Sequence, residues 1–197
     1  MVEGASEASM SAWAPSVSLR LPPPRSGEEL RGSAKTTNPH RMTDPRLPSS
    51  ARPHPEHEGW HHWPDIPADS FAGQTGLILF RAEGDQARVR MFPSPKHLNM
   101  GGSIHGGAVM SFIEMALFAG GRIAGMGEGH YVTLDCATHF IARGRIGVPL
   151  DAVVRLVGQT KGGHIFLSGH CEQDGQPTHS FTGTLKRIRT TGAKEDA

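Results

Sequence analysis

The sequence has few cysteines, few aromatic residues and almost no net charge. Its 197 residues include two cysteines, too few for the disulfide framework of a small secreted domain. Aromatic residues make up 6% of the chain, and 20 basic side chains are nearly balanced by 19 acidic ones. A nucleic-acid-binding protein would carry a basic excess, so we exclude that class of partner. We expect Cys136 and Cys171 to be buried free thiols in a reducing cytoplasm, where we place the protein.

Long apolar runs are also lacking. No apolar run follows Met1 that could serve as a secretory signal. The most apolar segment, Ala108–Ala124, is shorter than the roughly 20 residues that span a bilayer, and it contains Glu114. Because this segment is apolar on nearly every side, we predict a helix that is wrapped by protein and expect no membrane partner.

The first 59 residues lack the apolar side chains that a core requires. Between Met1 and Gly59 the single aromatic residue is Trp13, and most of the 15 prolines precede residue 68. Apolar burial cannot offset the ordering entropy of such a segment, so we predict a disordered proline-rich tail over residues 1–59. Met42 is a candidate true start, which would make residues 1–41 an extension. We assign residues 60–190 to the folded domain and residues 191–197 to a flexible C-terminus.

From residue 76 onward, strand-like runs alternate with turn sequences. The runs Gly76–Glu83 and Gln86–Phe92 flank a Gly84-Asp85 turn, and a helix is predicted over about residues 106–124. Short glycine-containing connections join the later runs, which indicates antiparallel pairing. The predicted fold is α+β: one long buried helix wrapped by a curved antiparallel sheet of five to six strands. The later runs are Tyr131–Ile141, Leu150–Thr160, His164–Gln173 and Thr178–Ile188.

Residues suited to chemistry gather around the start of this helix. Gly106 and Gly107 lie at its N-terminus, where free backbone N–H groups and the helix dipole favour negative charge. Such an amide can stabilise the charge that develops on a carbonyl oxygen. Glu114 follows Gly106 by eight residues, roughly 12 Å along the helix axis. Because both cannot touch one atom within a single chain, the spacing indicates a site shared between two subunits.

Each of these residues also has a structural interpretation. The glycine pair can form a close turn, His105 can cap the helix, and Asn99 can hold the loop by hydrogen bonds to the backbone. Glu114 can be a buried structural acid paired with Arg122 or with a loop amide. The histidines of the strand-like runs are interpreted as ordinary sheet residues, and the irregular histidine cluster of the proline-rich stretch is not expected to bind metal. These histidines are His130, His139, His164, His170 and His179 in the strands, and His54, His57, His61 and His62 in the cluster.

The segment His97-Leu98-Asn99, Gly102, His105-Gly106-Gly107 and Glu114 resembles the signature of hotdog-fold acyl-CoA thioesterases. The resemblance covers about residues 70–190 and points to the phenylacetic-acid-pathway (PaaI-like) branch of the 4-hydroxybenzoyl-CoA thioesterase superfamily. It implies a homodimer or homotetramer that hydrolyses an acyl-CoA to a free acid and coenzyme A, without a metal or redox cofactor. A binding module that senses acyl-CoA without turnover is the alternative.

The resemblance also implies roles for individual residues. Asn99 orients the thioester or the attacking water. The Gly106 amide polarises the thioester carbonyl, with His105 near the leaving sulfur. Glu114 is the nucleophile or the general base, and Thr133 holds water on the following strand.

One residue departs from the pattern of the family. Phe118 stands where the 4-hydroxybenzoyl branch with glutamate has threonine, which argues against that branch and its substrate.

The phosphates of coenzyme A need cations or helix ends. Our candidates for substrate binding are Gly107, Arg143, Lys161 and Lys186.

Overall fold

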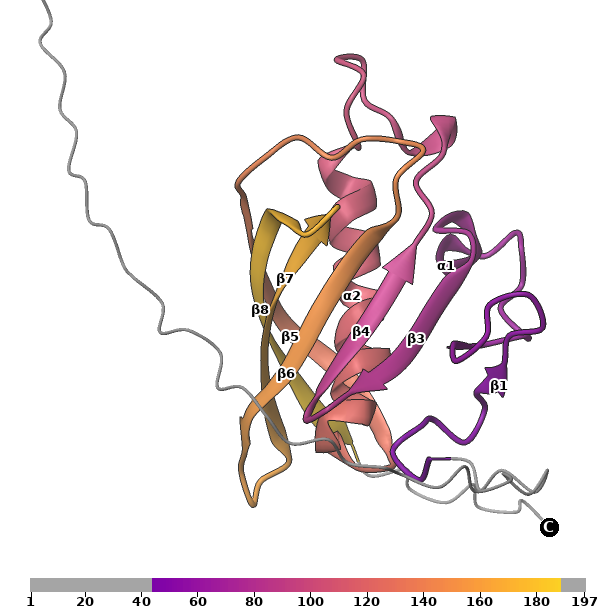
Figure 1. The fold of residues 1–197 in the computed structure, drawn as a ribbon. Helices are drawn as coiled ribbons and strands as arrows, with labels where there is room; N and C mark the ends of the chain where they lie inside the picture. The colour runs from indigo at the N-terminus through magenta and orange to yellow at the C-terminus, as the bar shows by residue number, and fades with distance from the viewer. Residues whose placement is uncertain (1–43, 189–197) are drawn as a thin grey trace, which may run out of the picture. The chain divides into compact units, whose positions relative to one another are not determined.

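The computed structural model describes residues 44–188. Two helices and eight strands follow one another, with a short 3-10 turn before the long helix and a π-helical turn after it (Figure 1). In chain order the elements are β1 (Arg52–Pro53), β2 (His61–His62), α1 (Phe71–Gln74), β3 (Ile78–Glu83), β4 (Gln86–Met91), η1 (Pro95–His97), α2 (Gly106–Gly121), η2 (Arg122–Met126), β5 (His130–Phe140), β6 (Leu150–Gln159), β7 (His164–Gln173) and β8 (Gln176–Ile188).

All eight strands belong to one antiparallel sheet, in the order β1-β2-β3-β4-β6-β7-β8-β5. The predicted fold class, one long helix packed on a curved antiparallel sheet, is confirmed. The six longer strands lie within about two residues of the predicted runs. The sheet has more strands than the five to six expected, because β1 and β2, of two residues each, extend it beyond β3.

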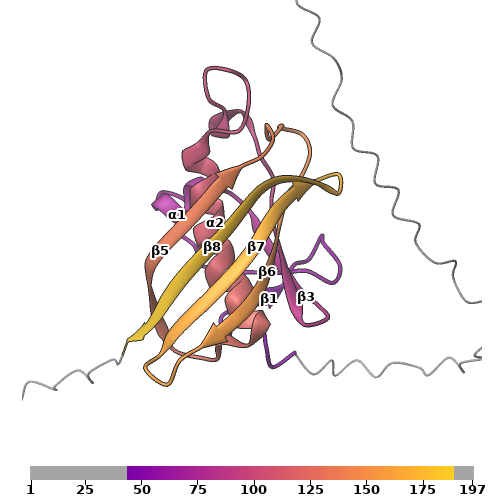
Figure 2. The same cartoon turned by 90° about the vertical axis from the view of Figure 1, so that its left-hand side faces the viewer.

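Helix α2 lies against the inner face of the curved sheet (Figures 1 and 2). Its side chains Phe112 and Leu117 are fully buried there. Glycine lets helix and sheet approach closely, because a Cβ on Gly183 of β8 would lie 2.4 Å from Leu117 Cδ1. On the helix itself, a Cβ on Gly120 would lie 2.6 Å from the Cβ of Val154. The position of α2 therefore depends on residues that carry no side chain.

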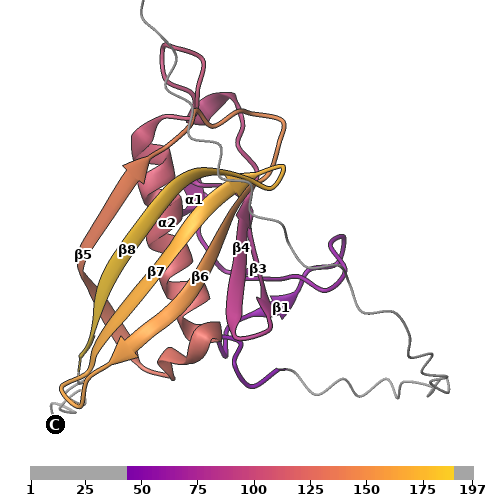
Figure 3. The ribbon, with the colours of Figure 1, turned by 60° about the vertical axis from the view of Figure 1, so that its left-hand side comes forward.

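One side of α2 is not covered by the sheet in the part of the chain that the structure describes. Met110 is 45% exposed, and Glu114, Met115 and Phe118 are half-buried. Met110, Glu114 and Phe118 follow one another at intervals of four residues, which places them on one stripe of the helix with Met115 beside it. Strand β5 lies beside this stripe and pairs with β8 alone among the described strands, so no described strand lies at its other edge (Figure 3).

Residues 44–63 fold against the sheet edge and contribute to its packing. Leu47 and Trp60 are buried, and the Trp60 ring lies 4.4 Å from the guanidinium carbon of Arg81 and 4.6 Å from that of Arg90. These cation–π contacts join the segment to β3 and β4. The predicted domain boundary at residue 59 is therefore wrong for residues 44–59. The rest of the predicted tail, the candidate start at Met42 and the predicted C-terminal segment 191–197 lie outside the described residues.

Two further predictions concern the apolar helix and the two cysteines. Within residues 44–188, the segment Gly106–Met126 is the one helical stretch long and apolar enough to cross a membrane. In this fold it is the core helix, packed inside the sheet. Cys136 and Cys171 are both free thiols, as predicted, but Cys171 is buried and Cys136 is half-buried. Burial raises the pKa of both thiols above the ordinary value.

Candidate active site

The N-terminus of α2 is capped by the side chain that precedes it. His105 has an extended backbone, and its Nδ1 accepts a hydrogen bond from the Gly107 N–H at 2.9 Å. This confirms the structural interpretation of His105 as a cap. The Gly106 N–H has no acceptor among the described residues, as expected for the first position of a helix. The arrangement leaves the Gly106 amide available to a ligand.

The loop before the helix is closed by Asn99. Its Oδ1 accepts hydrogen bonds from the backbone N–H groups of Gly101 at 2.9 Å and Ser103 at 3.2 Å. Its Nδ2 donates to Ser103 Oγ at 3.0 Å. In this structure the Asn99 side chain therefore holds the loop, the structural alternative considered for it. Its predicted role in orienting a substrate or water stays a prediction.

Glu114 and Thr133, which are 19 residues apart, are brought together by α2 and β5. The Thr133 hydroxyl donates a hydrogen bond to Glu114 Oε1 at 3.2 Å. Arg122 does not neutralise this carboxylate, because its guanidinium pairs with Glu128. The structural interpretation that paired Glu114 with Arg122 is therefore wrong. Glu114 Oε2 has no partner among the described residues, so this oxygen is free to accept a proton.

A cavity of about 410 Å³ opens beside the free amide of Gly106. Its wall includes Asn99, Phe140 at the end of β5, and Arg143 in the loop that follows. The structure thus places three of the predicted site residues, Asn99, Gly106 and Arg143, around one space. It does not place Glu114 or Thr133 there, in agreement with the separation expected from the helix spacing.

A second cavity, of about 440 Å³, lies on the other side of the α2 N-terminus. His105 and Gly107 line it together with Ala108, Leu98 and the exposed ring of Phe71 from α1. The predicted binding residue Gly107 therefore faces a different space from Gly106. Lys96 also lines this cavity, so its wall combines apolar side chains with one cation.

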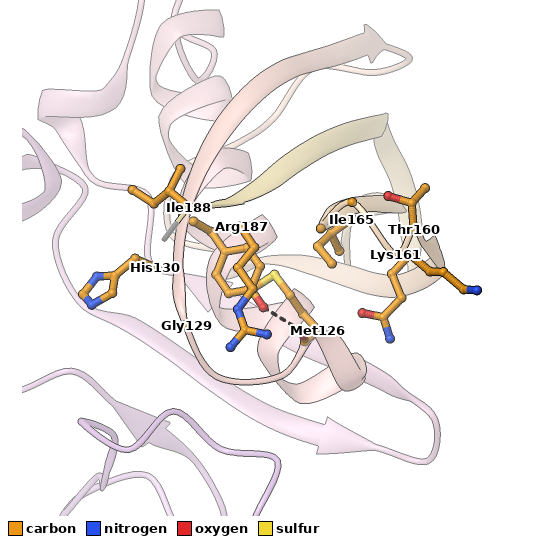
Figure 4. Close-up of a pocket in the computed structure, with 12 residues that line it drawn as sticks. Met126, Gly129, His130, Thr160, Lys161, Ile165, Arg187 and Ile188 are labelled. Carbon is orange, nitrogen blue, oxygen red and sulfur yellow. Dashed lines mark hydrogen bonds between the residues drawn. The ribbon is translucent and has the colours of Figure 1, made fainter. Parts of the chain in front are cut away.

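Two of the predicted phosphate-binding lysines lie away from Gly106. Lys161, in the β6–β7 hairpin, lines a cavity of about 720 Å³ with His130 and Arg187, near the C-terminal end of the long helix (Figure 4). Lys186 donates a hydrogen bond to the carbonyl of Gly162 and so anchors this hairpin. Since α2 alone is ~24 Å long, the structure does not bring Lys161 and Lys186 to the cavity at Gly106 within one chain.

The cavity at Gly106 is also lined by a titratable side chain that the sequence did not indicate. His179, interpreted above as an ordinary sheet residue, is 2% exposed and lines this cavity from β8. Burial lowers its pKa below the ordinary value. The sequence gives no signal of this placement, because it does not reveal that the pairing of β8 with β7 shifts by one residue beside His179.

The histidine rings of the N-terminal stretch contact one another in tilted and edge-on arrangements. The rings of His54 and His57 have centroids 4.7 Å apart, and those of His54 and His62 are 4.8 Å apart. Within the described part of the chain, no group of three or more His, Cys, Asp or Glu side chains is arranged to hold a metal ion.

The central part of the sequence matches a known family. The model of the thioesterase superfamily matches residues 101–162, a segment that includes Gly106, Glu114 and Thr133. No curated protein matches the chain significantly.

Solved structures with the same fold cover most of the described residues. AziG from S. sahachiroi has a TM-score of 0.53 at 20% identity, and the match covers 62% of this chain and 99% of AziG. The protein smu.793 from Streptococcus mutans UA159, solved with acetyl CoA, has a TM-score of 0.52 at 18% identity, covering 64% of this chain and 96% of smu.793. The E. coli PaaI protein from the phenylacetic acid degradation operon has a TM-score of 0.47 at 23% identity, covering 52% of this chain and 76% of PaaI.

At these identities the structural matches establish the fold, and the family model adds the sequence pattern. The family model and the folds of AziG and smu.793 together confirm the resemblance to the hotdog-fold thioesterase superfamily. The chain is a hotdog-fold protein whose residues 101–162 carry the sequence pattern of the thioesterase superfamily.

Proposed function

We propose that the protein hydrolyses an acyl-CoA thioester to a free carboxylic acid and coenzyme A. The observation that carries this proposal is the unpartnered Gly106 amide, which opens into a cavity at the N-terminus of α2. A thioester carbonyl placed there would receive a hydrogen bond and the favourable field of the helix dipole as negative charge develops on its oxygen. The family match of residues 101–162 and the acetyl CoA in smu.793 support this substrate class.

Glu114 acts as the general base in the mechanism that we favour. One oxygen is held by the Thr133 hydroxyl, so the other is free to take a proton from water. The hydroxide attacks the carbonyl carbon, and the charged tetrahedral intermediate is stabilised by the Gly106 amide. Its collapse breaks the C–S bond, and the thiolate of coenzyme A leaves and is protonated. The alternative is direct attack by Glu114 on the carbonyl carbon, which forms a mixed anhydride. Incorporation of an oxygen isotope from water into the Glu114 carboxylate would reveal this route.

The active unit in this proposal is at least a homodimer, with each site built from two chains. Gly106 and Glu114 are separated by roughly 12 Å along α2, so they cannot act on one carbonyl within a chain. The uncovered stripe around Glu114 and the edge of β5 at which no described strand lies are next to each other, which gives a second copy a surface to cover. In a two-fold arrangement, the helix N-terminus of one subunit would face the carboxylate of the other.

Mixing two inactive variants tests the shared site. We expect Glu114→Gln and Gly106→Val each to be inactive, because one lacks the base and the other fills the space beside Phe140. A hybrid dimer of the two variants contains one site in which both residues are intact. After subunit exchange in equal amounts, activity should return to about a quarter of the wild-type level. No recovery in a mixture shown to contain hybrids would mean that each site lies within one chain.

Arg143 is the cation best placed to bind a phosphate of coenzyme A, because it lines the cavity at Gly106. We expect Arg143→Ala to raise KM for acyl-CoA by about tenfold, the loss of one charge-assisted contact. Hydrolysis of a thioester without phosphates should not change. Arg145→Ala is the matched control, since this exposed side chain pairs with Asp174 and should leave KM unaltered. An equal loss on both substrates would contradict the assignment.

The first assay is the release of coenzyme A thiol from a panel of aromatic and aliphatic acyl-CoAs. Turnover of at least one member is expected, and the preferred acyl group would name the substrate class. Binding without turnover would instead assign the protein as a sensor of acyl-CoA.

A further inference from the structure

His179 is held in one orientation by a bulge between β7 and β8. Cys171 pairs with His179 and Glu172 pairs with Pro177, so Thr178 is an extra residue in β8. Both Thr178 and His179 are buried, although alternate residues of a regular strand face opposite sides. The bulge therefore brings two consecutive side chains into contact, and Thr178 Oγ1 lies 2.9 Å from His179 Nδ1.

The hydrogen bonds of Thr178 favour one tautomer of this imidazole. The Thr178 hydroxyl donates its one proton to the carbonyl of Cys171 at 3.2 Å. With that proton on the carbonyl, the Thr178 oxygen accepts from His179, and we assign the ring proton to Nδ1 on this basis. Nε2 consequently carries a lone pair. It has no partner among the described residues, and the ring lies in the wall of the cavity at Gly106.

The environment of His179 keeps the ring neutral. Burial lowers its pKa below the ordinary value, so at neutral pH the imidazole carries no charge and Nε2 remains an acceptor. Arg143 is the one charged residue in the described wall of this cavity. The site therefore offers a donor at Gly106, an acceptor at His179 and a cation at Arg143.

The distance between His179 and Gly106 limits which part of a bound substrate His179 can contact. The ring of Phe140 packs edge-on against His179, with centroids 5.1 Å apart, and its Cζ atom lies 3.3 Å from where a Cβ of Gly106 would be. His179 is thus about one aromatic ring away from the carbonyl position at Gly106. A base that activates the attacking water must lie within hydrogen-bond reach of that water, which excludes this role. The separation instead suits a polar group a few bonds beyond the thioester.

We propose that His179 Nε2 accepts a hydrogen bond from an amide N–H of the substrate's pantetheine arm. The first amide nitrogen of this arm is four bonds from the thioester carbonyl carbon, on the leaving-group side. His179 would then recognise the carrier of the acyl group and leave the acyl group itself to other contacts. This inference rests on the proposed thioester substrate and adds a specificity residue that contacts it.

Two matched thioesters test the contact. Both carry the same acyl group, one on N-acetylcysteamine and one on the analogue in which CH₂ replaces the amide N–H. The wild-type protein should prefer the amide by about tenfold in kcat/KM, because the analogue leaves the acceptor unpaired. His179→Leu should abolish this preference, and His179→Gln, which presents an amide oxygen near the position of Nε2, should retain part of it. His170→Leu, on the opposite face of the sheet, should keep the full preference.

The outcomes separate this inference from the proposed hydrolysis. Equal losses on both thioesters in His179→Leu would mean a structural role and overturn the inference. If no thioester is hydrolysed, binding of pantetheine decides: weaker binding by His179→Leu than by the wild type supports the contact, and equal binding or none overturns it. Should His179→Leu fail to fold, nitrogen NMR of the wild-type protein gives the answer. An unprotonated Nε2 signal that shifts when pantetheine binds is expected, and a protonated or unresponsive Nε2 overturns the inference.

Discussion

Glu114→Gln is expected to lower kcat for the best acyl-CoA substrate by about 10²–10³-fold while substrate binding changes little. Glutamine keeps the size of the side chain and can still accept the hydrogen bond of Thr133 through its amide oxygen. It cannot take a proton from water, so the chemical step should fail while the cavity stays intact. The measurement is thiol release under saturating substrate, with binding followed separately by calorimetry.

Glu128→Gln is the matched control for this change. Glu128 is an exposed acid near the C-terminal end of the same helix, paired with Arg122 and distant from the cavity at Gly106. Its replacement should leave kcat within about twofold of the wild type, as for most surface changes. If Glu114→Gln kept more than about a tenth of the activity, general-base catalysis by this residue would be wrong.

Gly169→Ala should destabilise the fold by about 3 kcal/mol or more, because the added methyl group has no space in the sheet. A Cβ on Gly169 of β7 would lie 2.2 Å from the carbonyl oxygen of Val153 and 2.5 Å from the Phe181 ring. The first of these neighbours is backbone in β6 and cannot move without disturbing the ladder between the two strands. Strain in this pairing would reduce the free energy of unfolding throughout the central sheet.

Urea unfolding at one fixed protein concentration measures this effect, because association would otherwise change the apparent stability. Gly158→Ala on the adjacent strand is the control, since a Cβ there would meet nothing within 4 Å. Its free energy of unfolding should stay within about 0.5 kcal/mol of the wild type. Equal stability of the two variants would show that β6 and β7 can separate at little cost.

The arrangement of helix and strands could be predicted because its signals are local. Turn sequences such as Lys161-Gly162-Gly163 separate the strands, and the run after Gly106 is apolar over many consecutive residues. Strands β1 and β2 carry no such pattern, since two residues cannot show alternation. The placement of Trp60 depends on two arginines from β3 and β4, contacts that only the folded chain creates.

Part of the candidate site could also be predicted from the sequence, and part of it could not. The spacing from Gly106 to Glu114 follows from helix geometry, so their separation could be stated in advance. The sequence also located the free amide, since Gly106 begins the helix. The direction in which Lys186 points could not be predicted, because a hairpin carbonyl rather than a ligand holds its amine. His179 required knowledge of the bulge, which depends on the register of two strands.

The bulge at Thr178 also sets the phase of strand β8. After the bulge, Phe181 and Leu185 face the core, and Thr182 between them is exposed. One residue more or one fewer in the turn before the bulge would therefore exchange the two faces of the strand. Which residue of β8 reaches the cavity therefore depends on the exact number of residues between the turn and the bulge. When this region is aligned with other hotdog proteins, a gap shifted by one position would assign the wrong residue to the pocket, even if every other strand were matched correctly.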